Sequence, residues 1–179
     1  MVLVGHSAGW ASVARYQADS SDKRVAGLVF ASGEIVGNLQ GTADPNWVRQ
    51  ARKLVDEGDG EDLLRIPNRS IPSFISAATE LDTIHRPREY ADFFGTQTPN
   101  PPILRVSCPL LAFFGTKDDI GDDKGLLLLK SSVQRLSKGP RSVRTTTITG
   151  GNHEYVGEEA QVAQKIAQWV AAECSLERK

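Results

Sequence analysis

The chain has 179 residues, 40% of them hydrophobic, a size and composition that suit one domain with a packed core. Its formal net charge is −1, from 21 basic and 22 acidic residues, and it has no basic block or interleaved aromatic stripe, so we expect no nucleic-acid partner. No apolar run approaches the roughly 20 residues that cross a bilayer.

The two cysteines, Cys108 and Cys174, belong to no motif, and we expect reduced thiols in a cytoplasmic protein. The three histidines lack the spacing of metal ligands, so no structural metal is predicted.

The first stretch of the chain combines a short apolar run with a Gly-x-Ser-x-Gly pattern. Residues 2–9 read Val-Leu-Val-Gly-His-Ser-Ala-Gly, and a helical pattern follows. This context predicts a nucleophile elbow, in which a strand ends at Ser7 and a helix starts at once. The hydroxyl is then held clear of the sheet at the positive end of the helix, and the backbone N–H of Ala8 faces an oxyanion as it forms. We expect a side chain at either Gly5 or Gly9 to clash, so both sites need hydrogen.

The motif Gly5-His6-Ser7-Ala8-Gly9 resembles the elbow of the serine α/β-hydrolases. The resemblance implies an α/β fold with a mainly parallel sheet, flanking helices and a helical lid insertion, no cofactor, and a small-molecule acyl substrate. In this family the triad runs serine, acid, histidine along the chain. Several strands and helices precede the elbow strand in the family, whereas this chain begins with that strand and shows no charged region of a signal peptide. The chain is therefore interpreted as the C-terminal portion of a hydrolase, with the N-terminal strands missing.

A strand–helix–strand unit starts at the motif. Apolar spacing predicts a helix over about 8–18, and a nearly continuous apolar run predicts a buried strand over 25–31. Such a βαβ unit places two parallel strands in one sheet. Glu34 follows the carboxyl end of the second strand, where ligands gather in α/β sheets. It is a candidate triad acid, and a solvated loop carboxylate is the alternative interpretation.

Residues 35–105 differ in character from the apolar strands on either side. Gly, Pro, Asn and Asp are frequent, and the segment is too long for a simple crossover between two strands. Helices are expected after Asp44-Pro45 and over 70–81. We interpret the segment as a helical lid, with 1–34 and 106–179 as the α/β-hydrolase core. Four of its aromatic residues either line an acyl or aromatic pocket or pack the lid helices together: Trp47, Phe74, Phe93 and Phe94.

The sheet resumes with a fully apolar strand over 109–115. The sequence Phe114-Gly115-x-x-Asp118 resembles the acid-bearing strand end of the family, where the catalytic aspartate stands three residues after the glycine. The resemblance assigns Asp118 as the triad acid. Asp119, one residue away with the same chemistry, and Glu34 are the alternatives. Helix capping or loop solvation would explain these carboxylates without catalysis.

The last part of the chain predicts a helix over 122–136, a half-polar strand over 143–149 near the sheet edge, and an amphipathic final helix. Between the strand and the final helix stands Gly150-Gly151-Asn152-His153. A glycine-rich loop with a histidine resembles the base-bearing loop of the family, and its glycines let the imidazole of His153 reach back over the elbow. A loop histidine of no consequence is the alternative.

These assignments predict a serine hydrolase that cleaves an ester, thioester or related acyl bond through Ser7, His153 and Asp118. His6 is expected to point away from the serine hydroxyl and to take no part. The family's second oxyanion donor comes from a loop after an earlier strand, which we expect to be missing, and the first strand would then have a bare edge that favours self-association. The alternative is a catalytically impaired fragment, or a pseudo-hydrolase that acts as a binding module.

Overall fold

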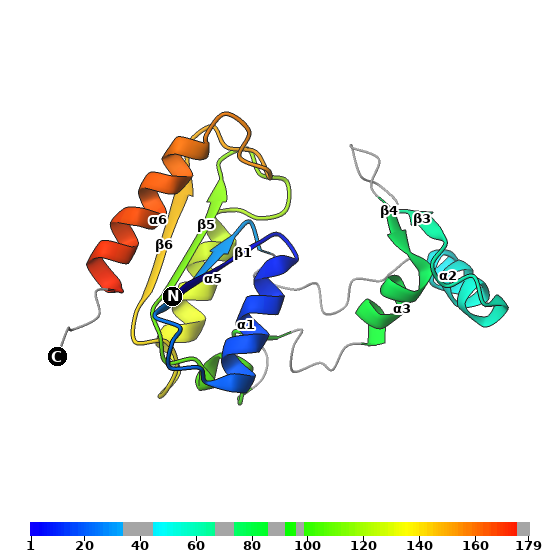
Figure 1. The fold of residues 1–179 in the computed structure, drawn as a ribbon, viewed down its shortest axis with the longest axis horizontal. Helices are drawn as coiled ribbons and strands as arrows, with labels where there is room; N and C mark the ends of the chain where they lie inside the picture. The colour runs from blue at the N-terminus through cyan, green and yellow to red at the C-terminus, as the bar shows by residue number, and fades with distance from the viewer. Residues whose placement is uncertain (34–44, 67–73, 86–91, 96–98, 175–179) are drawn as a thin grey trace. The chain divides into compact units, whose positions relative to one another are not determined.

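The computed structural model describes residues 1–33, 45–66, 74–85, 92–95 and 99–174. The chain divides into two units, one of Met1–Gly37 with Asp92–Lys179 and one of Asn38–Ala91 (Figure 1). The first unit contains every residue assigned to the predicted triad and the predicted oxyanion donor. None of the helices within the described ranges is long and apolar enough to cross a membrane.

Four parallel strands form the sheet of the first unit: β1 (Val2–His6), β2 (Gly27–Ala31), β5 (Leu110–Gly115) and β6 (Val143–Ile148). They pair in the order β1-β2-β5-β6. Each strand lies in the stretch that its apolar or β-branched pattern predicts. The structure therefore confirms the mainly parallel α/β fold, and it places the half-polar β6 at a sheet edge, as expected.

Three helices flank this sheet: α1 (Gly9–Ser20), α5 (Asp123–Gln134) and α6 (Glu159–Glu173). Side chains of β2 alternate between two apolar layers. Leu28 and Phe30 pack in the layer that α1 and α5 share, whereas Val29 and Ala31 pack in the layer under α6. Figure 1 shows α1 and α6 on opposite sides of the sheet. Because β2 and β5 are buried on both faces, their sequences are nearly continuous apolar runs rather than alternating ones.

The strand that carries the elbow occupies the other edge of the described sheet. β1 pairs with β2 on one side only, and Val4 in its middle is 51% exposed. An apolar edge strand offers unpaired backbone groups to a further strand. Self-association through β1 stays a prediction.

The second unit contains a helix pair and a short hairpin: α2 (Pro45–Glu57), β3 (Leu63–Arg65), β4 (Phe74–Ser76) and α3 (Ala77–His85). The predicted helix after Asp44-Pro45 is present as α2. The prediction of a helix over 70–81 is wrong at its start, because Phe74–Ser76 forms β4 and the helix begins only at Ala77. Ile75 pairs with Leu64 of β3, and this pairing between distant residues overrides the helical spacing. The unit is therefore mixed and not purely helical.

The segment from Asp92 to Arg105 belongs to the first unit. The second unit therefore ends at Ala91, earlier than the predicted lid segment 35–105. Phe93, Phe94 and Ile103 are buried in the layer under α1. A short 3₁₀ helix, η1 (Pro102–Arg105), packs beside α1. Glu34, the alternative acid after β2, lies outside the described residues.

Candidate active site

The turn between β1 and α1 has the geometry of the predicted elbow. Ser7 lies at φ 50°, a left-handed conformation that few non-glycine residues adopt. Its backbone N–H donates to the carbonyl of Ala31 at 2.9 Å, which ties the turn to the end of β2. A Cβ at Gly5 would lie 2.5 Å from the Cα of Trp10 and 2.6 Å from the carbonyl oxygen of Gly9. Only glycine at position 5 therefore lets the helix begin this close to the strand.

The second glycine of the motif differs from expectation. A Cβ added at Gly9 would meet no atom of the described residues within 4 Å. The predicted clash at this position is wrong, because Gly9 is the first residue of α1 and its Cβ direction points into open space.

The predicted oxyanion donor lies at the N-terminus of α1. Ala8 is the N-cap residue of this helix, where the helix dipole is positive. Within the described ranges its N–H donates to no backbone acceptor. This amide is therefore free to donate to a substrate oxygen beside Ser7.

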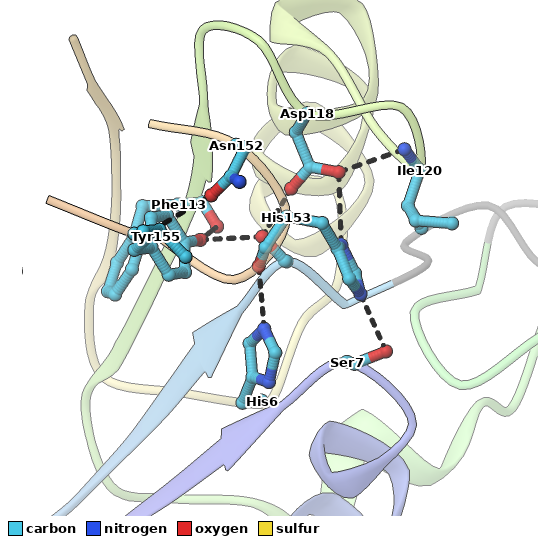
Figure 2. A network of polar contacts seen from close by, with 10 residues as sticks. His6, Ser7, Phe113, Asp118, Ile120, Asn152, His153 and Tyr155 are labelled. Atoms are coloured by element: carbon cyan, nitrogen blue, oxygen red, sulfur yellow. Dashed lines mark hydrogen bonds and ion pairs between the residues drawn. The ribbon is translucent and has the colours of Figure 1, made fainter. Parts of the chain in front are cut away.

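Three side chains from three strand ends meet above this turn, as Figure 2 shows. The Oγ of Ser7 lies 2.9 Å from the Nε2 of His153, and the Nδ1 of His153 lies 3.1 Å from the Oδ1 of Asp118. A carboxylate can only accept, so Nδ1–H donates to Asp118, and Nε2 accepts the proton of the Ser7 hydroxyl. The Asp118 side chain is 0% exposed and that of His153 is 16% exposed. The structure thus brings together the serine, histidine and aspartate that the sequence motifs predict.

The loops that carry Asp118 and His153 are joined by backbone hydrogen bonds beyond the ends of β5 and β6. Thr116 N–H donates to Ile148 at 2.9 Å, and Lys117 N–H donates to Gly151 at 2.8 Å. A Cβ at Gly115 would lie 2.1 Å from the carbonyl oxygen of Gly151, so glycine is required for this approach. The close contact fixes the distance between the two loops and hence between Asp118 and the imidazole.

Asp118, rather than Asp119, contacts the imidazole. Asp119 is exposed, although its carboxylate and the ligand atoms of Asp118 and His153 all lie within 4.8 Å of one another. These three residues are also the group of acidic and histidine side chains that could bind a metal ion. A metal ion would have to displace the hydrogen bonds that already engage Asp118 and both nitrogens of His153.

Three further side chains lie beside His153 and Asp118, and no sequence motif indicates a role for them. The Nε2–H of His6 donates to the carbonyl oxygen of His153 at 2.7 Å. The Ser32 hydroxyl donates to the Oδ2 of Asp118, and Tyr155 OH lies 2.7 Å from the Ser32 oxygen. Ser32 follows the carboxyl end of β2, so the strand-end rule that pointed to Glu34 could also have found it.

Burial changes the acidity of one of these groups. Tyr155 is buried against Phe113, with ring centroids 5.6 Å apart. Burial raises the pKa of Tyr155 to about 12, because the phenolate would lose its hydration; the hydrogen bond between Tyr155 and Ser32 opposes the rise and the nearby Asp118 adds to it. The phenol is therefore protonated, and a hydrogen-bond donor, throughout the neutral range.

The four predicted pocket residues divide between the two units. Phe93 and Phe94 are buried in the first unit, where their ring centroids lie 5.9 Å and 5.4 Å from that of Trp10. Trp47 packs on the apolar cluster of the second unit, and Phe74 is exposed there. Their part in a substrate pocket stays a prediction.

A family model described as "Alpha/beta hydrolase family" matches residues 2–165. The chain therefore belongs to the α/β-hydrolase family.

Solved structures with the same fold include an esterase domain from Rhodothermus marinus (TM-score 0.52, 14% identity) and a monoacylglycerol lipase from Paleococcus ferrophilus (TM-score 0.58, 19% identity). A third is a soluble variant of monoglyceride lipase from Saccharomyces cerevisiae (TM-score 0.60, 14% identity). The alignments cover 97%, 96% and 97% of this chain, but only 62%, 68% and 62% of the three solved chains. At these identities the likeness shows the fold alone. A search of curated proteins found no significant match.

Proposed function

We propose that this protein is a serine hydrolase that cleaves carboxylic esters or related acyl bonds through Ser7, His153 and Asp118. One observation carries the proposal: the Ser7 hydroxyl, held in a strained turn at φ 50°, lies 2.9 Å from His153, which in turn contacts a buried carboxylate. A nucleophile, a base within hydrogen-bond reach and a group that orients the base are the three parts that activate a serine.

The reaction follows from these contacts. His153 takes the hydroxyl proton at Nε2 while Ser7 Oγ attacks the acyl carbon, and Asp118 stabilises the imidazolium through Nδ1. His153 then gives that proton to the leaving alkoxide, which departs as an alcohol and leaves an ester on Ser7. A water molecule attacks this ester with His153 again as base; His153 then returns the proton to Ser7 Oγ as the acyl–oxygen bond breaks, and the acid product is released. The N–H of Ala8 donates to the carbonyl oxygen while it carries negative charge.

The proposed substrate class is a small carboxylic ester. A serine nucleophile suits acyl carbons, since the acyl-enzyme splits one difficult displacement into two easier steps. The solved structures with the same fold include, by name, an esterase domain, a monoacylglycerol lipase and a monoglyceride lipase. Short-chain aryl esters and monoacylglycerols are therefore the first compounds to test.

The test is labelling by a fluorophosphonate probe, which reacts with an activated serine. We expect labelling of the wild type and none of Ser7→Ala. Ser12, which is exposed on α1, gives a matched control: Ser12→Ala should label like the wild type. Hydrolysis of p-nitrophenyl butyrate, followed in the same variants, should show the same pattern.

The binding-module alternative makes the opposite prediction for the same experiment. A wild-type chain that is folded by circular dichroism, is not labelled and releases no nitrophenol would contradict the hydrolase proposal. It would support a pseudo-hydrolase that binds its ligand without cleaving it.

A further inference from the structure

The carboxylate of Asp118 has further hydrogen-bond partners besides His153. The Oδ1 of Asp118 accepts from His153 and from the backbone N–H of Ile120 at 2.9 Å. The Oδ2 of Asp118 accepts from the hydroxyl of Ser32. Both oxygens of this fully buried side chain are therefore engaged, and Figure 2 shows the bonds meeting at the carboxylate.

The direction of the hydrogen bonds is set by the carboxylate. Asp118 can only accept, so Ser32 gives its single proton to Oδ2. The Ser32 oxygen then accepts from Tyr155, whose hydroxyl lies 2.7 Å away. The carbonyl of Phe113, at 3.3 Å, is the weaker alternative acceptor for the same phenolic proton.

The two hydroxyl residues are held in unusual backbone conformations. Ser32 lies at φ 50° and Tyr155 at φ 58°, both in the left-handed region. Such conformations cost of order 1 kcal/mol or more and persist only where the surroundings enforce them. Ser32 N–H donates to Phe113 at 2.9 Å, and Tyr155 N–H donates to Asn152 at 3.1 Å. Backbone bonds thus hold both residues in place beside Asp118.

We propose that Ser32 and Tyr155 are positioning residues for the triad: Tyr155 orients the Ser32 hydroxyl, and Ser32 fixes Asp118 so that its other oxygen faces His153. The inference rests on the proposed hydrolase function. Tyr155 stands two residues after His153 and on the same loop. The base loop therefore reaches the acid by two routes, directly through the imidazole and indirectly through the two hydroxyls.

Loss of the Ser32 donor has a defined electrostatic consequence. A buried carboxylate with one unsatisfied oxygen carries more uncompensated negative charge beside the imidazole, which favours the imidazolium. The acidic midpoint of the pH–rate profile should then move to higher pH. Among the described residues, two other titratable groups lie beside this site: His6, whose ring centroid lies 5.1 Å from that of His153, and Asp119. Both remain unchanged in the variants below.

The experiment compares Ser32→Ala, Tyr155→Phe and the double variant in the full chain. We expect Ser32→Ala to lower kcat by about tenfold to a hundredfold with little change in KM, and to raise the acidic midpoint by about one pH unit. Tyr155→Phe should change kcat and the acidic midpoint in the same directions but by smaller amounts, with a fall in kcat of about two- to tenfold. The double variant should match Ser32→Ala, because Tyr155 acts only through Ser32.

Two matched controls remove a hydroxyl that donates to a carboxylate elsewhere. Ser142 donates to Glu173 at 2.8 Å, and Tyr16 donates to Asp22 at 2.7 Å. Ser142→Ala and Tyr16→Phe should leave the midpoint where it is in the wild type. Tyr155→Phe keeps the ring packed on Phe113, so it remains informative if Ser32→Ala fails to fold.

A second readout does not require turnover. The titration of the His153 imidazole, followed by nitrogen NMR and assigned with His153→Gln, should show the same upward shift in Ser32→Ala. A titration that is identical in the wild type, Ser32→Ala and Tyr155→Phe would overturn the inference, as would effects that add fully in the double variant. Absence of labelling in the wild type would instead count against the hydrolase function, so the two failures are distinguishable.

Discussion

The Nε2 of His6 lies 2.7 Å from the carbonyl oxygen of His153. A carbonyl only accepts, so the imidazole of His6 donates, and the residue just before Ser7 holds the backbone of His153. The rings of the two histidines also pack, with centroids 5.1 Å apart (Figure 2). The sequence predicts that His6 points away from the serine hydroxyl and takes no part, and this prediction does not include its contact with the backbone of His153, which holds that loop over the elbow.

We predict that His6→Ala lowers kcat/KM for ester hydrolysis by about two- to tenfold, the value of one neutral hydrogen bond. His6→Gln is the matched control, because the amide nitrogen of glutamine can donate from nearly the same position as Nε2 and should restore most of the loss. The rate of p-nitrophenyl ester hydrolysis and the rate of fluorophosphonate labelling are measured for His6→Ala, His6→Gln and the wild type. Equal rates for His6→Ala and the wild type would show that the base loop needs no such support.

The choice between the two neighbouring aspartates gives a sharper prediction. Asp118→Asn should lower kcat by about 10⁴-fold, as in other Ser-His-Asp triads, because an amide can hold the imidazole in the wrong tautomer. Asp119→Asn removes an exposed charge nearby and should change kcat by less than about threefold, since an exposed charge acts through water of high dielectric constant. Measurement of kcat for both variants with the same ester tests this, and a larger loss for Asp119→Asn than for Asp118→Asn would reverse the assignment of the acid.

The two glycines of the motif should respond oppositely to alanine. Gly5→Ala places a methyl group 2.5 Å from the Cα of Trp10, so backbone must move, and we expect a loss of about 1–3 kcal/mol in the free energy of unfolding. Gly9→Ala adds a methyl group in open space at the first turn of α1 and should be neutral or stabilising by up to about 1 kcal/mol. Urea denaturation of the two variants measures both. Equal destabilisation would mean that the elbow is tight on both sides.

The sequence predicts the sheet and the triad for the same physical reason. Strands buried on both faces are apolar throughout, so β2 and β5 are recognisable without any alternation, and each ends where glycine or polar residues begin. The carboxyl ends of parallel strands meet at one edge of a sheet. Ser7, Asp118 and His153 each follow the carboxyl end of a strand. Their positions in the sequence therefore predict that the three side chains lie close together.

What the sequence does not predict depends on contacts across the fold. Ser32 and Tyr155 meet only because β5 lies between β2 and β6 in the sheet. Strand β4 (Phe74–Ser76) falls within the expected helix over 70–81, because it pairs with β3, which lies elsewhere in the sequence. Phe93 and Phe94 pack against Trp10, and no local pattern distinguishes this from packing inside the second unit.

The cysteines give a prediction that is independent of catalysis. Burial raises the pKa of Cys108 to about 11, and it also raises the pKa of Cys174. Because the thiolate is the reactive form, only about one thousandth of Cys108 is reactive at pH 8. Iodoacetamide should therefore label neither thiol in the folded protein and both in guanidinium chloride, as peptide mass mapping would show. Rapid labelling of the folded chain would contradict the buried position of the labelled residue.

The end of α6 supplies a pH-dependent contribution to stability. Glu173 accepts from Ser142 and Arg144, each at 2.8 Å, and its carbonyl accepts from Arg141 at 2.7 Å. The hydrogen bond from Ser142, followed by that from Arg144, lowers the pKa of Glu173 below its ordinary value. A carboxyl group whose pKa is lower in the folded state stabilises the fold above its unfolded pKa, and this stabilisation is lost as the pH falls through the folded pKa.

We therefore expect Glu173→Gln to lower the free energy of unfolding at pH 7 by less than about 1 kcal/mol, since Arg144 is largely exposed. The difference from the wild type should shrink as the pH falls below about 4, because the wild-type carboxylate then becomes protonated as well. Glu154→Gln is the control: Glu154 is exposed and forms no ion pair with a described residue, so its effect should be small and constant with pH. Urea denaturation of the variants and the wild type from pH 3 to pH 8 tests this. If the free energy of unfolding of Glu173→Gln differs from that of the wild type by the same amount at pH 3 and pH 8, the charge of Glu173 does not stabilise the fold.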